Sequence, residues 1–258
     1  MKSPFRYLIY DIESVTDKPL LNKVLYQHER LDDEAAFKKH LAELATEERD
    51  FVNPAFHQPI SLAALAVGDD FSISRIGLLG GESKTTESIV RDFWEIYQKN
   101  RPVLVDFNGK GFDLRLLELW AYRLGITIGE EHFGKYGPRY RFADDKHIDL
   151  HEWMTNYGAI RFRGGLNLFA KLIGKPGKME TSGQQVQELF EAGQQFVIDD
   201  YCLSDALDTY FIFLRTRVMK GEISLERERE LGEQAKKKIL EKSEKEGYFK
   251  KYLERLPA

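Results

Sequence analysis

The sequence predicts an α/β domain with a mixed β-sheet at its centre. Short apolar segments typical of buried strands alternate with amphipathic helical segments, and two of the apolar segments are joined by a tight turn. Alternation of strands with helices favours parallel pairing, whereas strands joined by a short turn form an antiparallel hairpin. We therefore expect an antiparallel hairpin and parallel strands in one sheet, with helices flanking its faces.

The expected strands are 5–12, 59–67, 71–81, 102–107 and one within 146–154. The second and third are separated only by Gly-Asp-Asp, which is typical of a hairpin turn.

The expected helices are 85–100, 112–126, 166–177, 182–193 and 197–221. In the first of them Ile89, Phe93 and Ile96 fall on one side, as in a helix that covers a sheet. Gly125 and Gly221 end two of the others, in the position that glycine takes after a helix.

Two charged, helix-prone segments lie outside this pattern. Residues 17–53 read as a helical surface insertion, and residues 222–258 as a C-terminal helical extension with few large apolar residues. We therefore divide the chain into a domain at 1–221, which contains the insertion, and the extension at 222–258. A helix as rich in Lys and Glu as the extension is typically solvated, and docking of a partner is the alternative.

Composition excludes several classes of protein. The 258 residues carry a net charge of −4, so no basic field over the whole surface attracts a polyanion, and any such contact must be local. Cys202 is the sole cysteine, which excludes internal disulfides and cysteine-rich zinc sites and fits a reducing compartment. We interpret it as a small buried residue. There is no leader pattern and no apolar run of about 18 residues, so we expect a cytoplasmic protein without membrane contact.

Asp11 and Glu13 stand at the end of the first expected strand. Alternate residues of a strand point to the same side, so their carboxylates would repel each other unless a cation lay beside them. The alternative is that the strand ends at Tyr10 and both acids belong to a solvated turn.

Two further motifs place acids at the ends or on the faces of elements. Asn108 follows the strand at 102–107, and Asp113 opens the next helix. Tyr201 and Asp205 lie four residues apart on the last long helix and share one face. Each motif has a simple structural alternative. An acid at the start of a helix interacts favourably with the helix dipole, and a tyrosine one turn from an acid is common on a half-buried helix face.

Taken together, the motifs direct four carboxylates towards one place, namely Asp11, Glu13, Asp113 and Asp205. Such a group is unfavourable without a cation, since like charges raise one another's pKa values. Oxygen ligands suit Mg²⁺ or Mn²⁺, and two such ions about 3.5–4 Å apart clamp both oxygens of a phosphoryl displacement. The sequence therefore predicts a site for two ions, with the Tyr201 hydroxyl near the attacking water.

The three motifs resemble Exo I, Exo II and Exo III of the DEDD superfamily of 3′–5′ exonucleases. This chain has them in the family's order as Asp11-x-Glu13, Asn108-x-x-x-Phe112-Asp113 and Tyr201-x-x-x-Asp205. A sister branch has His five residues before the last Asp, where this chain has Asp200, so the resemblance is to the tyrosine-bearing branch. More narrowly, residues 7–217 resemble predicted bacterial exonucleases related to the proofreading domain of family B DNA polymerases.

The resemblance implies an RNase H-like fold and removal of nucleotides from a 3′ end with two metal ions. The ligands it implies are Asp11, Glu13, Asp113 and Asp205. It also implies that Tyr201 positions the attacking water, and that Asn108 and Phe112 shape the pocket for the terminal nucleotide, with Phe112 stacking on a base.

Residues 147–151 offer a different metal site. His147, Asp149 and His151 alternate, so on one strand they would face a single Zn²⁺ or Mn²⁺ ion. The other interpretation is a polar strand end with Asp149 near the catalytic edge.

Basic and aromatic residues alternate in two segments, a composition typical of a track for a single strand. They are Arg139, Tyr140, Arg141, Phe142, Arg161, Phe162 and Arg163. We assign Arg161 and Arg163 to substrate binding, and the alternative is a solvated loop rim.

The sequence thus predicts an Mg²⁺- or Mn²⁺-dependent 3′–5′ exonuclease that hydrolyses single-stranded DNA to nucleoside 5′-monophosphates. RNA or short oligoribonucleotides are the nearest rival substrates, because the 2′-OH is recognised by pocket geometry that sequence does not reveal. Two further hypotheses are a non-catalytic nucleic-acid-binding module and an enzyme that hydrolyses a small phosphodiester.

Overall fold

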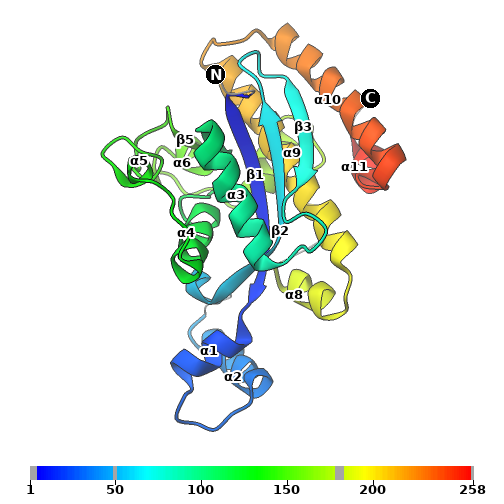
Figure 1. Ribbon diagram of the computed structural model, residues 1–258. Helices are drawn as coiled ribbons and strands as arrows, with labels where there is room; N and C mark the ends of the chain where they lie inside the picture. Colours follow the sequence, from blue (N-terminus) through cyan, green and yellow to red (C-terminus); the bar gives the residue numbers. More distant parts are fainter. Residues whose placement is uncertain (1–4, 49–50, 178–182, 257–258) are drawn as a thin grey trace.

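The computed structural model describes residues 5–48, 51–177 and 183–256. A five-stranded sheet lies at its centre in the order β3-β2-β1-β4-β5 (Figure 1). The strands are β1 (Tyr7–Thr16), β2 (His57–Val67), β3 (Ile73–Leu78), β4 (Val103–Asp106) and β5 (His147–Asp149). Each overlaps a segment in which the sequence predicts a strand.

The pairing confirms the mixed sheet. The hairpin partners β2 and β3 are antiparallel, and β2 is also antiparallel to β1. On the other side of β1, β4 pairs parallel with β1, and β5 pairs parallel with β4.

Strand β1 is longer than the sequence suggests, and this decides where the two acids lie. It continues to Thr16 instead of stopping at residue 12, because β2 pairs with it along the whole length, with a bulge between Glu13 and Ser14. Asp11 lies opposite Ala63 and Glu13 opposite Ser61, so both acids are within the strand. The alternative in which the strand ends at Tyr10 is wrong.

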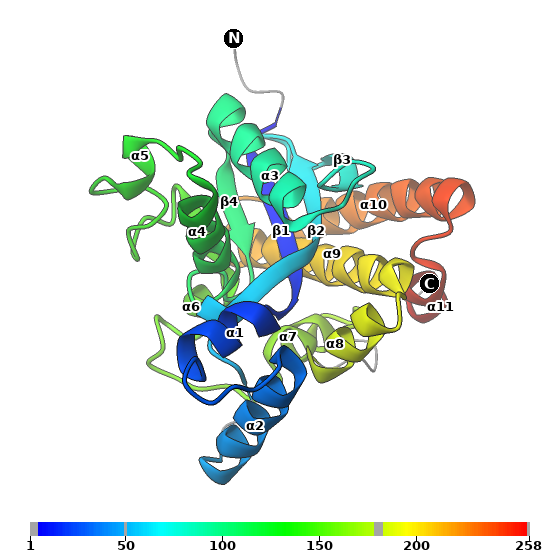
Figure 2. The same ribbon diagram turned by 60° about the horizontal axis from the view of Figure 1, so that its bottom comes forward.

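Helices cover both faces of the sheet (Figure 2). They are α1 (Lys18–Leu25), α2 (Asp33–Thr46), α3 (Thr86–Asn100), α4 (Asp113–Leu124), α5 (Glu130–Phe133), α6 (Leu150–Met154), α7 (Gly165–Leu172), α8 (Gly183–Glu191), α9 (Gln195–Met219), α10 (Leu225–Glu246) and α11 (Lys250–Arg255), with a 3₁₀ turn at Pro54–Phe56. In the part of the chain that is described, no helix combines the length and the apolar character needed to cross a bilayer.

The alternation of side chains along β1 assigns each face of the sheet to its helices. Leu8, Tyr10 and Ile12 pack with α3 and α4, whereas Tyr7 and Ile9 pack with α9. Continuation of the same alternation turns residues 11 and 13 towards α9, the helix that carries Asp205.

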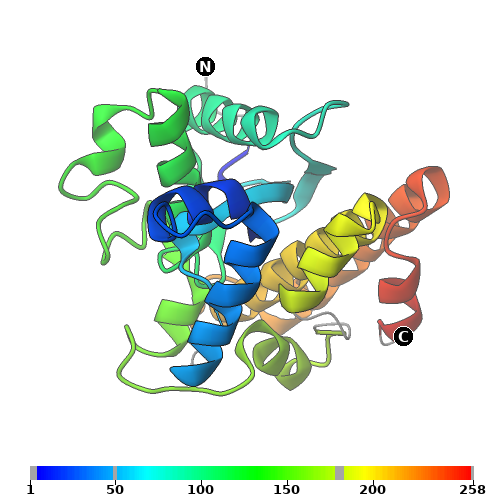
Figure 3. The same ribbon diagram turned by 90° about the horizontal axis from the view of Figure 1, so that it is seen from below.

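The insertion forms a small helical unit at the end of the sheet, in front of it in the view from below (Figure 3). Helices α1 and α2 enclose an apolar cluster of their own: Leu21, Tyr26, Ala36, Phe37, Leu44 and Val52. An ion pair of Lys18 with Glu191 (2.6 Å) links α1 to α8.

The C-terminal extension packs into the main core. Leu231, Ala235 and Ile239 of α10, with Phe249 and Tyr252, belong to the same buried cluster as α9 and the sheet. The interpretation of this segment as a solvated helix is therefore wrong for one face of α10, although the division of the chain at residue 221 stays a prediction.

Replacing Ile239 with Ala is expected to lower the free energy of unfolding by about 2–5 kcal/mol, because the side chain is fully buried. The neighbouring Leu240 is 42% exposed, so Leu240→Ala serves as the matched control and should change stability by about 0.5 kcal/mol or less. Denaturant unfolding of both variants measures the difference. Equal small effects would show that α10 does not contribute to the core.

Candidate active site

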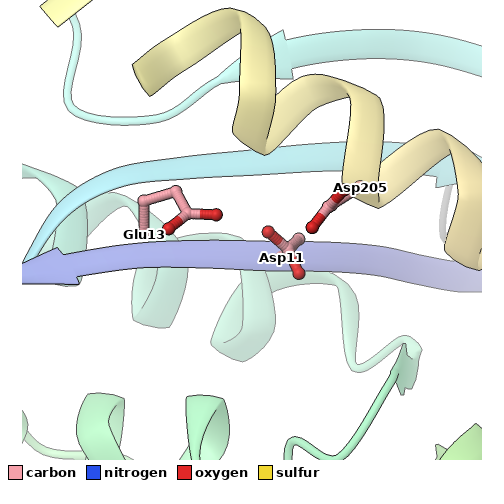
Figure 4. A group of neighbouring side chains, drawn as sticks. All are labelled: Asp11, Glu13 and Asp205. Carbon is pink, nitrogen blue, oxygen red and sulfur yellow. The ribbon is translucent and has the colours of Figure 1, made fainter. Parts of the chain in front are cut away.

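Three carboxylates from two distant parts of the chain converge beside the sheet. Asp11 and Glu13 extend from β1 and Asp205 from α9, each offering an oxygen within 4.8 Å of the others (Figure 4). Like charges this close are stabilised by a cation between them, and a donor set made only of carboxylate oxygens fits Mg²⁺ or Mn²⁺.

Cys202 holds α9 against the strands at this point. Its thiol donates a hydrogen bond to the Asp11 carbonyl oxygen (3.2 Å) and accepts one from the Ala63 backbone N–H (3.3 Å). The residue is fully buried, as the sequence predicts. The contact fixes the distance between β1 and the helical turn that leads to Asp205.

Asp113 lies in the wall of the same cavity but outside the group of three. It opens α4 and is buried, and the cavity of about 430 Å³ is lined by Asp113 together with Asp11, Glu13 and Asp205. Parallel pairing of β4 with β1 ends at Ile9, so the edge of β1 is open beyond it. The Ile12 backbone N–H at this edge donates a hydrogen bond to the Asp113 carboxylate.

The electrostatics of Asp113 differ from those of a solvated acid. Burial raises the pKa of its carboxyl well above the usual range, and the negative charges of Asp106 and Asp149 raise it further. The Ile12 N–H opposes this rise in part. Because burial and two acids favour the neutral form, a bound cation is the group that would favour the charged one.

A buried hydrogen-bond network supports the loop between β4 and α4, and the sequence did not predict it. Asp106 accepts hydrogen bonds from the Tyr10 hydroxyl (2.6 Å) and the Gly109 N–H (3.0 Å), and it pairs with His147 Nε2 (2.6 Å). A Cβ at Gly109 would lie 2.0 Å from the Asp106 carboxylate, so this position requires glycine. The network fixes the loop that carries Asn108.

The alternating residues 147–151 do not form a metal site. The His147 ring faces Asp106 and the Pro138 carbonyl oxygen, whereas Asp149 accepts the N–H groups of Asn108 (2.9 Å) and Lys110 (3.1 Å). Asp149 also caps α6, on which His151 lies, so the strand ends before His151. The interpretation of a polar strand end is the correct one for this segment, and Asp149 lies beside the loop that carries Asn108.

Tyr201 lies one helical turn before Asp205, as the spacing predicts. Its side chain is buried and its hydroxyl donates a hydrogen bond to the Asp205 carboxylate. Burial raises the pKa of Tyr201 far above its usual value, and the charges of Asp205, Glu13 and Asp11 add to the rise. The phenol therefore stays protonated and acts as a hydrogen-bond donor beside the carboxylates.

An aromatic wall closes one side of the cavity, and only one of its three members was expected. Phe112 lies edge-on to His57 (ring centroids 5.7 Å apart) and to Phe51 (5.6 Å), and Phe51 stacks on His57 (4.9 Å). All three line the cavity. No periodicity marks Phe51 or His57 in the sequence, because they enter the wall through the insertion and the start of β2.

His57 is neutral at physiological pH. Burial lowers its pKa to about 4, and its Nδ1 lies 3.0 Å from the Ser14 hydroxyl. It therefore offers the site a flat ring without a charge.

The expected substrate-binding residues occupy different places. Asn108 is exposed and lines the cavity, with a left-handed backbone (φ 73°). Arg161 and Arg163 are exposed on the loop that leads to Gly164 and Gly165, which line the cavity, although the arginines themselves do not.

A second cavity, of about 390 Å³, adjoins the first. Asn108 and His151 line both of them. The basic side chains in its wall are Lys110, Arg115, Arg139 and Arg141, and the acid is Glu152. These basic side chains are ion-paired with Glu118, Asp144 and Glu152. The cavity that holds Asp11, Glu13 and Asp205, here called the acidic cavity, therefore lies beside a group of basic side chains, although the protein as a whole is acidic.

Asp208, three residues beyond Asp205, gives the fold a measurable pH dependence. Burial raises its pKa to about 7, and its carboxylate accepts a hydrogen bond from the Tyr252 hydroxyl (2.7 Å). A carboxyl whose pKa is raised on folding stabilises the folded state fully at pH values below its pKa in the unfolded chain. For Asp208 this contribution is lost as the pH rises through the folded-state pKa of about 7.

Replacing Asp208 with Asn should therefore stabilise the protein at pH 8 and have little effect near pH 4. Folding raises the pKa of Asp208 by about three units. At about 1.4 kcal/mol per unit, this sets an upper bound of about 4 kcal/mol on the gain in the free energy of unfolding at pH 8. Denaturant unfolding of both proteins at the two pH values gives the difference. A variant that is less stable than the parent at pH 8 would contradict the raised pKa.

The chain is similar to a family of known proteins. Residues 49–256 match the family model of a predicted 3′–5′ exonuclease related to the exonuclease domain of PolB. The match includes Asn108, Asp113, Tyr201 and Asp205 and begins after Asp11 and Glu13. No curated protein matches the chain.

The chain is also similar to a solved structure, the family B DNA polymerase from the hyperthermophilic archaeon Pyrobaculum calidifontis. The TM-score is 0.52 at 18% identity, over 83% of this chain and 25% of that polymerase. Identity this low shows the fold alone, which is RNase H-like, and the chain spans about a quarter of the polymerase. By its family match, the chain belongs to the predicted 3′–5′ exonucleases related to the exonuclease domain of PolB.

Proposed function

We propose that the protein hydrolyses single-stranded DNA from its 3′ end to nucleoside 5′-monophosphates, using two Mg²⁺ or Mn²⁺ ions. The observation that carries this proposal is the convergence of Asp11, Glu13 and Asp205 within 4.8 Å, in a cavity that Asp113 also lines. A fold by itself does not determine an activity, so the function is inferred from the residues of this site.

The carboxylates of Asp11, Glu13 and Asp205 would hold the ions, with Asp113 facing them from the wall of the cavity. Two divalent cations supply Lewis acidity to the attacking and leaving oxygens of a phosphodiester displacement. The protonated Tyr201 hydroxyl, already hydrogen-bonded to Asp205, is the group that would orient the attacking water.

The surroundings of the cavity fit a nucleic-acid strand. In the neighbouring cavity Arg139 and Arg141 are 51% and 54% exposed. Each pairs with an acid through Nε, Arg139 with Glu118 (3.7 Å) and Arg141 with Glu152 (2.8 Å), and their exposed guanidinium groups would contact phosphate groups of the strand. Asn108 stands where the two cavities meet, and Arg161 and Arg163 precede the glycines at the rim. A local basic surface of this kind reconciles an acidic protein with a polyanionic substrate.

The proposal is tested with DNA and RNA oligomers of the same sequence, labelled at either end, with Mn²⁺ or Mg²⁺ and with chelator. From 3′-labelled DNA we expect labelled mononucleotide at the earliest time points, and from 5′-labelled DNA a ladder that shortens one nucleotide at a time. Chelator should stop both. Faster degradation of the RNA would reassign the substrate, and binding without any mononucleotide would show a non-catalytic module.

A further inference from the structure

The 17–53 insertion contributes an aromatic residue to the acidic cavity, and the function proposed above does not use it. Phe51 follows α2 and lies in the wall of the cavity that holds Asp11, Glu13 and Asp205. Its neighbour Val52 is buried in the apolar cluster of the insertion. The ring is therefore attached to a packed unit while it faces the site.

The Phe51 ring contacts two other rings of the wall, and its side chain is still half exposed. The His57 ring stacks on it with centroids 4.9 Å apart and planes inclined by 21°. Phe112 approaches edge-on (5.6 Å, 67°). The Phe51 side chain nevertheless remains 50% exposed, whereas Phe112 is only partly exposed.

The Phe51 ring is a flat apolar surface in the cavity that holds the carboxylates, and such a surface suits a nucleobase. Aromatic side chains stack on bases of any sequence, because every base has a π-face. His57, whose pKa is lowered to about 4, supports Phe51 from behind with an uncharged ring. A purely structural role would need Phe51 only to cover His57, and it would not make the enzyme sensitive to the base of its substrate.

We infer that Phe51 stacks on the base of the 3′-terminal nucleotide, so that the helical insertion forms part of the substrate site. This inference rests on the proposed exonuclease function. In this arrangement Phe112 supports the wall from the side, and Phe51, with its greater exposure, presents the stacking surface.

The test compares two DNA oligomers that differ only at the 3′-terminal residue, which carries a base or is an abasic tetrahydrofuran residue. We measure kcat and KM for removal of that residue. The parent protein should prefer the base-bearing end by about tenfold or more in kcat/KM. Phe51→Leu, which keeps apolar contact with His57 but lacks a π-face, should lose most of this preference through KM, whereas Phe51→Trp should retain it.

Phe133→Ala is the matched control, since Phe133 is also 50% exposed and does not line the cavity; it should keep the parent preference. An unchanged preference in Phe51→Leu, or an equal loss on both oligomers, would overturn the inference while the exonuclease function stands. Absence of product from both oligomers with the parent protein would overturn the proposed function and this inference with it.

Discussion

Replacing Asp205 with Asn is expected to lower mononucleotide release by about 1,000-fold, or roughly 4 kcal/mol of transition-state stabilisation. The Asp205 carboxylate lies beside those of Asp11 and Glu13, and the neutral amide of Asn would replace one charged oxygen ligand. Steady-state release of mononucleotide from a single-stranded DNA oligomer with saturating Mn²⁺ measures the effect.

The same variant should keep its fold. Removing one of three neighbouring negative charges relieves repulsion in the cation-free protein, and the Asn oxygen still accepts the hydrogen bond from Tyr201. The melting temperature without cation should therefore be equal to or higher than that of the parent. An inactive variant that melts earlier would point to misfolding instead.

Asp200→Asn is the control for this experiment. Asp200 lies on the same helix, outside the acidic cavity, where it accepts the Phe249 N–H (2.5 Å). We expect its activity to stay within a few-fold of the parent. Asp205→Asn activity within tenfold of the parent would exclude Asp205 from the catalytic group.

Divalent cation should raise the stability of the parent protein by about 2.7 kcal/mol at 100 times the dissociation constant. For a chain of this size that corresponds to a melting temperature about 5–11 °C higher. The cause is the repulsion among Asp11, Glu13 and Asp205, which a cation converts into attraction. Thermal unfolding in an Mn²⁺ titration, reversed by chelator, measures it.

The double variant Asp11→Asn with Asp205→Asn should lose this stabilisation, and Asp200→Asn should retain it. The comparison separates the site from unspecific binding of cations to an acidic surface. An equal shift in the double variant and the parent would show that the cation binds elsewhere.

Local periodicity in the sequence was enough to predict most of the fold. The hairpin of β2 and β3 was marked by its turn, and α3 and α4 by their apolar faces and terminal residues. The same rules also predicted part of the geometry of the candidate site. Alternation along a strand put Asp11 and Glu13 on one face, and helical spacing put Tyr201 beside Asp205.

Predictions failed where partners distant in the sequence decide the outcome. Strand β1 extends past residue 12 because β2 continues to pair with it, and α10 is buried because α9 offers it an apolar face. Only one face of α10 is buried, that of Leu231, Ala235 and Ile239. Both effects depend on a second segment that a local pattern does not contain.

What the sequence determined by itself are the residue types and spacings of the acids and of Tyr201, because periods of two and of about 3.6 residues follow from backbone geometry alone. Only the tertiary structure decided that Asp113 lies in the cavity wall, on the open edge of β1, and that Phe51 and His57 join Phe112 there. These positions depend on where β4 and the insertion end and where β2 begins, because all three border the same cavity. Such contacts join segments far apart in the chain, and their free energy comes from packing and buried hydrogen bonds that no short stretch of sequence encodes.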